Sequence, residues 1–270
     1  MIPENFIEQW RQHVKWQTPA QVEQDLIISR ALTDLYNDPH VSEALVFRGG
    51  TALNKLFLKP SSRYSEDIDF VQKNADPIGQ TIDAIRAVLN PWLGDPKWKI
   101  TQRSAKLIYK YEAINKLPAK LKIEINTTEH FQVLPLRSEE FNVDSDWWSG
   151  NAKIATYEID ELMATKLRAL YQRRKGRDLF DLWYVTKNEL INLDRVFEIF
   201  TKYCANDDSC FTKDEFIKNL ELKRDHQAFQ SDMHALLPTG LKWSFDEAYQ
   251  FVLDNVISRQ TSFHKITFLI

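Results

Sequence analysis

The sequence predicts an α+β protein in which a mixed α/β N-terminal half, residues 1–155, precedes a helical C-terminal half, residues 156–270. Strand-like alternation of apolar and polar residues is confined to the first half, and helical spacing dominates from Tyr157 onward. The composition, 43% hydrophobic and 27% charged, is typical of a folded soluble protein. At 270 residues the chain is long enough for two domains of ordinary size.

The charge balance excludes a global attraction to nucleic acid or membrane. The net charge is -3, from 38 acidic and 35 basic residues, so any polyanion site must be a local basic patch. No apolar run approaches the length of a membrane span, and the segment "MIPENFIEQWRQHVKW" is too polar for a signal peptide. We therefore expect a cytoplasmic protein with no membrane partner.

Periodicity assigns the elements of the first half in order. The helical stripe of residues 19–36 is followed by a short apolar run that ends at two glycines, and then by a second helix. Beyond a loop, one strand, a third helix and a β-hairpin follow. The expected ranges are residues 19–36, 44–47, 51–58, 67–71, 77–93, 105–113 and 121–129.

Acidic residues alternate with apolar ones on the strand at residues 67–71. Asp67 and Asp69 share a face because residues two apart in a strand point the same way. The segment "LKIEIN" repeats the pattern and turns Glu124 outward. If the two strands are neighbours, three carboxylates converge and need a cation, and hard oxygen ligands suit Mg²⁺ or Mn²⁺. A lone acid-apolar-acid strand would otherwise be an ordinary amphipathic strand with solvated acids.

Two adjacent glycines favour the functional interpretation of these acids. Gly49 and Gly50 lie between an apolar strand and a helix, which can present backbone N–H groups to a phosphate. Thr51 can cap that helix, and the loop that follows contains Arg63 and Ser65. The spacing is not that of a Walker motif. A phosphate cradle beside carboxylates is what metal-dependent phosphoryl chemistry needs.

A second charged motif, "ELMATKLRALYQRRKGRDLFDLW", opens the helical half. Lys166 has apolar neighbours, so we expect its ammonium to have a specific partner. Lys166, Arg173 and Arg177 would share one helix face if the helix continues that far, although Gly176 is well placed to end it. Asp178 would then open the next helix.

The two aspartates of this motif have alternative interpretations. Asp178 is either the cap of the second helix or a catalytic residue, and Asp181 is expected to have a structural place in the first turn. The remaining helices of this half are expected near residues 195–204, 213–222 and 245–256, and they contain no further motif.

Together these motifs resemble the polymerase-β-like nucleotidyltransferase superfamily, which has a glycine pair, an acid-apolar-acid strand and a third acid on a later strand. The strings "GGTALNK", "RYSEDIDF" and "RKGRDLFD" are similar to those of the AbiEii/AbiGii toxin branch, which includes the MenT-type toxins. The chain differs in a longer gap between Gly50 and Asp67 and in having Glu124 as its third acid.

The resemblance implies a polymerase-β-like core with a mixed sheet and a metal-dependent nucleotidyltransferase that uses an NTP and releases pyrophosphate. Metal ligands would be Asp67, Asp69 and Glu124. Catalytic residues would be Asp67, Asp69, Lys166 and Asp178. Nucleotide-binding residues would be Gly49, Gly50, Thr51, Arg63, Ser65, Lys166 and Arg177.

The resemblance also implies an acceptor and a partner. Relatives modify RNA, notably the 3′ end of tRNA, and a toxin of this kind has a cognate antitoxin or transcription regulator. Local basic residues that could contact phosphates are Arg103, Lys106, Lys110, Lys120 and Lys122. A protein or small-molecule acceptor, a Mn²⁺-dependent glycosyltransferase and a non-catalytic nucleotide-binding module remain alternatives.

Overall fold

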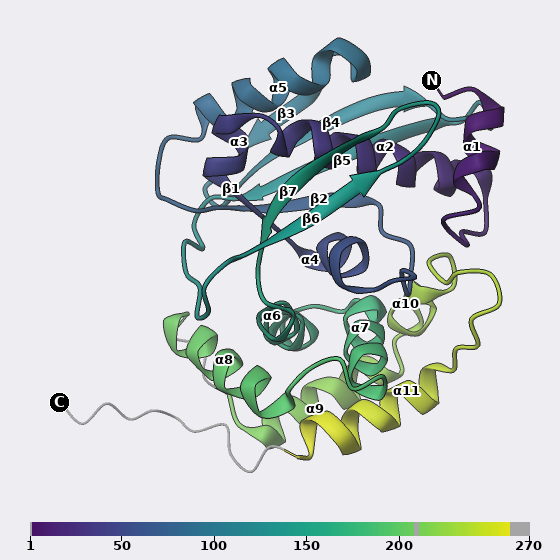
Figure 1. Cartoon of the computed structure of the whole chain (residues 1–270). Helices are drawn as coiled ribbons and strands as arrows, with labels where there is room; N and C mark the ends of the chain where they lie inside the picture. Colours follow the sequence, from purple (N-terminus) through teal and green to yellow (C-terminus); the bar gives the residue numbers. More distant parts are fainter. Residues whose placement is uncertain (1, 208–210, 260–270) are drawn as a thin grey trace. The chain divides into compact units, whose positions relative to one another are not determined.

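The computed structural model describes residues 2–207 and 211–259 of the chain. Contacts divide the chain into two compact units (Figure 1). The first comprises Met1–Tyr157 with Leu237–Thr239, and the second comprises Glu158–Leu236 with Gly240–Ile270. Within the described ranges, no helix has the length and apolar character needed to cross a membrane.

The first unit is built on a seven-stranded mixed sheet in the order β3-β4-β5-β2-β1-β7-β6. Strands β2 and β5 are parallel, as are β1 and β7, whereas every other neighbouring pair is antiparallel. The strands are β1 (Leu45–Arg48), β2 (Asp67–Gln72), β3 (Lys97–Ile100), β4 (Ser104–Glu112), β5 (Pro118–Asn126), β6 (Arg137–Val143) and β7 (Gly150–Thr156).

Helices cover one face of this sheet. Figure 1 shows α2, α3 and α5 on the same side of the strands. The apolar residues of the strands face them, and the ring of Tyr36 on α2 lies 6.0 Å from that of Phe70 on β2. The helices of this unit are α1 (Glu4–Trp10), α2 (Pro19–Tyr36), α3 (Pro39–Ala44), α4 (Gly49–Ala52), the π-helical turn η1 (Leu53–Phe57) and α5 (Gly79–Leu93).

The predicted alternation is confirmed in the central strands. Ile68 and Phe70 of β2 are buried, as are Ile123 and Ile125 of β5. Strands β4 and β5 form the predicted hairpin. The acidic residues of β2 and β5 consequently lie on the face opposite helices α2 and α5.

Some elements of the first unit differ from expectation. Strands β3, β6 and β7 were not predicted, and the expected helix at residues 51–58 begins at Gly49 and changes to a π-helical turn at Leu53. Three residues of the C-terminal half also belong to this unit: the Thr239 N–H donates to the Lys15 carbonyl at 2.8 Å, and Gln17 Nε2 donates to the Leu237 carbonyl at 2.8 Å.

The second unit is helical, as predicted. Its helices are α6 (Ile159–Gln172), α7 (Gly176–Lys187), α8 (Leu193–Asn206), α9 (Lys213–Arg224), α10 (Gln227–Gln230), the 3₁₀ turn η2 (Ser231–Met233), α11 (Phe245–Val252) and the π-helical turn η3 (Leu253–Ile257). Helices α6 and α7 contact each other, and α8 and α9 contact α6.

The junction between α6 and α7 corrects the prediction for Gly176. Helix α6 ends at Gln172, and Arg173 is already extended, so Gly176 begins α7 rather than ending α6. A Cβ atom at position 176 would lie 2.2 Å from the carbonyl oxygen of Phe229. Glycine is therefore required here by close packing, which local sequence does not reveal.

Candidate active site

Asp67 and Asp69 lie at the beginning of strand β2. The parallel register pairs Asp67 with Lys122 and Asp69 with Glu124 on β5. Directly paired residues point to the same side of a sheet, so the three predicted acids share one face with Lys122. The structure therefore brings the two acidic strands together as expected.

Lysine side chains occupy the space around two of these acids. Nζ of Lys122 lies 2.8 Å from Oδ2 of Asp67 and 3.4 Å from Oε2 of Glu124. Nζ of Lys106 lies 2.9 Å from Oε1 of Glu124. In the part of the chain that the structure describes, no three His, Cys, Asp or Glu side chains are grouped to hold a metal ion. The three acids share a face as expected, but Glu124 is paired with two ammonium groups, and its role as a metal ligand stays a prediction.

Asp69 has a different environment from Glu124. Within the described residues its carboxylate forms no hydrogen bond or ion pair. Burial raises the pKa of Asp69 and the charge of Asp67 raises it further, whereas Lys122 and Arg48 act in the opposite direction. A partly buried carboxylate beside a second one is stabilised by a cation between them, so Asp67 and Asp69 fit a divalent metal ion.

Gly49 allows the backbone to approach this carboxylate. Its φ angle is +80°, and a Cβ atom there would lie 2.8 Å from Oδ2 of Asp69. A side chain at position 49 would be strained and would also displace the carboxylate. Gly49, the first of the predicted glycines, thus leaves space for the carboxylate of Asp69, a predicted metal ligand.

Gly50 leaves room for the guanidinium of Arg63. A Cβ atom at position 50 would lie 2.1 Å from Nη2 of Arg63. Arg63 is 1% exposed, and its Nη1 donates to the Tyr64 carbonyl at 3.0 Å. Asn54 completes the arrangement, because its Nδ2 donates to the Gly50 carbonyl at 3.0 Å while its Oδ1 accepts from the Arg63 N–H at 3.1 Å. Arg63 therefore supports the glycine segment from inside the protein.

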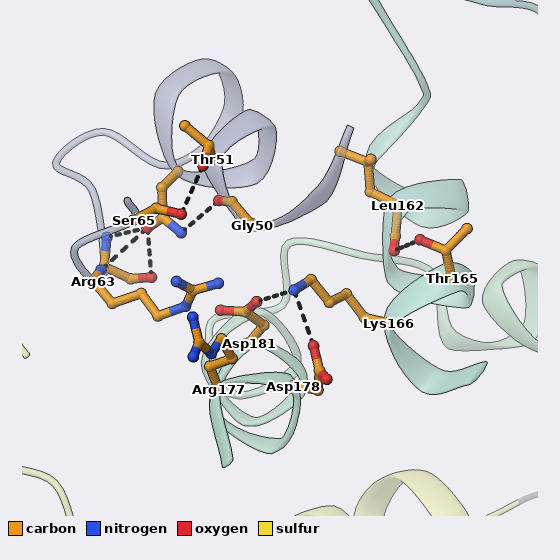
Figure 2. A network of polar contacts seen from close by, with 12 residues as sticks. Gly50, Thr51, Arg63, Ser65, Leu162, Thr165, Lys166, Arg177, Asp178 and Asp181 are labelled. Atoms are coloured by element: carbon orange, nitrogen blue, oxygen red, sulfur yellow. Dashed lines mark hydrogen bonds and ion pairs between the residues drawn. The ribbon is translucent and has the colours of Figure 1, made fainter. Parts of the chain in front are cut away.

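Thr51 joins the glycine segment to the acidic strand. It lies inside α4, and Arg48 occupies the N-cap position without a side-chain cap, so the predicted capping role of Thr51 is wrong. The Thr51 hydroxyl donates to the Asp67 carbonyl and therefore accepts from the Ser65 hydroxyl, at 2.7 Å (Figure 2). These contacts fix the position from which Asp67 projects.

Arg48 and Glu129 belong to this region and were missed by the sequence analysis. Arg48 pairs in the antiparallel register with Asp69, and its Nη1 lies 2.7 Å from Oε2 of Glu129. Burial acts to lower the pKa of Arg48, but Glu129, through its charge and a hydrogen bond, acts together with Tyr157 and Asp69 to raise it. The position of Arg48, directly before Gly49, was the available signal.

In the second unit, Lys166 lies between two aspartates. Its Nζ is 3.1 Å from Oδ1 of Asp178 and 2.9 Å from Oδ2 of Asp181 (Figure 2). Both carboxylate side chains are fully buried. Lys166 is thus held in a defined position by two aspartates, neither of which the sequence analysis identified as its partner, and its role toward a nucleotide stays a prediction.

Asp178 does not cap helix α7. Lys175 holds the N-cap position, and both oxygens of Asp178 are used within the cluster. Arg173 donates to it from Nε at 2.7 Å and from Nη2 at 2.9 Å. Burial would raise the pKa of Asp178, but Lys166 and Arg173 together lower it to about 2. Asp178 is thus an anion over the physiological range.

Arg177 points to a different acid. Its Nε lies 3.1 Å from Oδ2 of Asp232, and its Nη2 donates to Oδ1 of Asp232 at 3.2 Å. The helix does not continue far enough for Lys166, Arg173 and Arg177 to share one face, because α6 ends before Arg173. A role of Arg177 in binding nucleotide stays a prediction.

The chain matches a known family in sequence and known proteins in structure. A family described as "Nucleotidyl transferase AbiEii toxin, Type IV TA system" matches residues 30–251. The nucleotidyltransferase toxin MenT4 of Mycobacterium tuberculosis is similar in structure, with a TM-score of 0.66 and 16% identity over 96% of this chain and 91% of that chain. JHP933 of Helicobacter pylori has a TM-score of 0.52 and 18% identity, over 90% of this chain and 95% of that chain. No curated protein is significantly similar in sequence. The structural likenesses confirm the predicted fold.

Proposed function

The chain belongs to the AbiEii family of nucleotidyl transferase toxins of type IV toxin–antitoxin systems, and from this we propose that it transfers a nucleotide from an NTP to an RNA acceptor, the 3′ end of tRNA. Nucleotidyl transfer is the activity of the family, and the donor, the acceptor and the metal are our proposals. The close approach of the Gly49 backbone to the carboxylate of Asp69, which shares a strand face with Asp67, is the observation on which the proposal rests.

We assign the first unit as the nucleotidyltransferase domain. Asp67 and Asp69 would hold a divalent ion, Mg²⁺ or Mn²⁺, which neutralises phosphate charge and favours ionisation of the acceptor hydroxyl. Gly49 and Gly50 would bind the triphosphate through their backbone, and Thr51 would fix the start of the acidic strand. Ser65 and Arg63 would bind or orient the same segment.

The reaction breaks the α–β phosphoanhydride bond of the NTP and forms a phosphodiester bond to the acceptor. An acceptor hydroxyl loses its proton to solvent and attacks the α-phosphorus, the bond to the bridging oxygen breaks, and pyrophosphate leaves. We assign Lys166 as the fixed cation that stabilises this negative charge. Asp178 would orient Lys166, since it contacts its Nζ directly. Arg177 would assist as a second basic residue.

A lysine-rich sheet face supports RNA as the acceptor. The register places six lysines on the face that also carries Asp67 and Asp69; we call this set the lysine face. Its members are Lys97, Lys99, Lys106, Lys110, Lys120 and Lys122. In a chain of net charge -3, such a concentration provides the local positive surface that a phosphate backbone requires.

The family also implies an antitoxin partner. We propose that the protein acts in the cytoplasm, where tRNA and NTPs are present, and that its antitoxin or a transcription regulator limits its activity there.

Label transfer tests the proposal. The full chain, MgCl₂ and each α-labelled NTP in turn are incubated with total tRNA, beside a double variant carrying Asp67→Asn and Asp69→Asn. Label on tRNA from one NTP, lost in the double variant, is expected and names the donor. Circular dichroism of the variant confirms that it is folded.

Other outcomes separate the alternatives. Label on protein or on a small molecule, but not on RNA, would replace the acceptor and keep the reaction. Tight NTP binding with no transfer to any acceptor would favour a non-catalytic nucleotide-binding module. A double variant as active as the wild type would overturn the assignment of the two aspartates.

A further inference from the structure

The ammonium group of Lys122 lies beside the acids of the first unit, at a position where they would also attract a metal cation. Its Nζ is 2.8 Å from Asp67 Oδ2 and 3.4 Å from Glu124 Oε2, while Lys106 pairs with the other oxygen of Glu124. The carboxylates of Asp67 and Glu124 thus face two ammonium groups. Asp69 alone remains without an ion pair among the residues that the structure describes.

The pairing of Lys122 with Asp67 follows from the sheet itself. Parallel strands β2 and β5 place the two residues directly opposite each other, so the long lysine side chain needs only to bend toward its neighbour. Its side chain is 27% exposed and that of Asp67 is 34% exposed.

We propose that Lys122 is a built-in counter-ion that competes with the divalent metal for Asp67, so that metal binding requires the ammonium to leave this carboxylate. The inference rests on the proposed metal site of Asp67 and Asp69. A divalent ion on Asp67 would stand within a few ångströms of the ammonium, and repulsion at such a distance is unfavourable unless the lysine moves.

Competition of this kind has a chemical use. Without metal, Lys122 reduces the repulsion among the acids and so keeps the site formed. Once metal is bound, the ammonium released from Asp67 would keep Glu124 as its protein partner and would be free to approach a bound triphosphate. Lys122 would then contribute positive charge to the substrate side of the site.

Mn²⁺ binding by electron paramagnetic resonance tests the competition without any turnover. The full-length wild type is compared with Lys122→Met and with Lys120→Met. Lys120 is an exposed lysine on the same strand and face, so its replacement removes the same charge but no ion pair. We expect Lys122→Met to bind Mn²⁺ about fivefold more tightly than the wild type, and Lys120→Met to differ by much less.

A second measurement needs no variant. Lysines of the wild-type chain are acetylated briefly with and without saturating Mg²⁺, and the modified peptides are quantified by mass spectrometry. We expect acetylation of Lys122 to increase several-fold with Mg²⁺, because its ammonium loses the Asp67 partner, while that of Lys120 stays the same. This arm decides the matter if Lys122→Met does not fold.

The outcomes separate this inference from the proposed function. Equal Mn²⁺ affinity of wild type and Lys122→Met, or an equal gain in Lys120→Met, would overturn the competition while leaving the metal site in place. Lys122 acetylation that Mg²⁺ leaves unchanged would do the same. Absence of Mn²⁺ binding in all three proteins would overturn the metal assignment of the proposed function as well.

Discussion

Nζ of Lys166 lies 3.1 Å from Oδ1 of Asp178, although twelve residues and a helix boundary separate the two. The carboxylate is fully buried and the lysine side chain is 7% exposed. Loss of either charge would leave the other one buried without a partner, and this would destabilise the folded protein. The same residues are the proposed catalytic pair, so stability and activity must be measured separately.

We predict that Lys166→Met destabilises the protein as well as abolishing transfer. The substitution leaves Asp178 and Asp181 without their shared ammonium, and loss of one partner from a buried ion pair costs about 3 kcal/mol. Urea denaturation followed by circular dichroism measures the loss. Lys175→Met, which removes an exposed lysine at the N-cap of α7, is the matched control and should unfold like the wild type. If Lys166→Met were as stable as the wild type, the ion pairs of Lys166 with Asp178 and Asp181 would not contribute to stability as proposed.

The stability of the protein should also depend on pH through Asp178. Its pKa in the folded protein is about 2, below the ordinary value of 3.8. A lowered pKa contributes stability that is complete above about pH 4 and is lost as the pH falls through about 2. The contribution amounts to about 2 kcal/mol.

Asp178→Asn provides the comparison for this pH dependence. The difference in unfolding free energy between wild type and variant should narrow as urea denaturation is repeated at decreasing pH between 5 and 2, because only the wild type loses the charged contact. A constant difference across this range would show that Asp178 does not titrate as the cluster requires.

Much of the first unit could be predicted because the signal is local. Alternation in "DIDF" and "LKIEIN" identifies both the strands and the outward direction of their acids. Strand β3, "KWKI", alternates polar and apolar residues, but it was missed because it is only four residues long and lies exposed at the edge of the sheet. Strand β6, "RSEEFNV", is mostly polar and lies at the opposite edge. Short or largely polar edge strands give too weak a pattern to be assigned from the sequence.

The partners within the candidate site could not be predicted, because they depend on tertiary contacts. The sheet register brings Lys122 to Asp67, and no local pattern specifies that register. Gly176 was expected to end a helix, which is the usual place for glycine, whereas close approach of the Phe229 carbonyl explains it. The motif identified Lys166, but the fold alone determines that Asp178 and Asp181 share it.

Gly49→Ala should impair transfer far more than it impairs folding. The new Cβ atom would lie 2.8 Å from Asp69 Oδ2 and the residue would keep a φ of +80°. Gly94→Ala is the matched control, because Gly94 has a φ of +75° and no atom within 4 Å of its Cβ position. Both variants should lose about 1 kcal/mol of stability from backbone strain, and only Gly49→Ala should lose most label transfer. Equal activity of the two variants would remove Asp69 from the reaction.

Glu124→Gln tests whether the third acid binds metal. Both oxygens of Glu124 face lysines, at 2.9 Å from Lys106 Nζ and 3.4 Å from Lys122 Nζ, so the carboxylate is already neutralised within the protein. We therefore predict that Glu124→Gln keeps its Mn²⁺ affinity within about twofold of the wild type, since the lost contacts are exposed ion pairs of small energy. Asp69→Asn should instead lose Mn²⁺ binding, because no cation among the described residues forms an ion pair with Asp69. Equal losses in the two variants would restore Glu124 as a ligand, which would require both lysines to move aside when the metal binds.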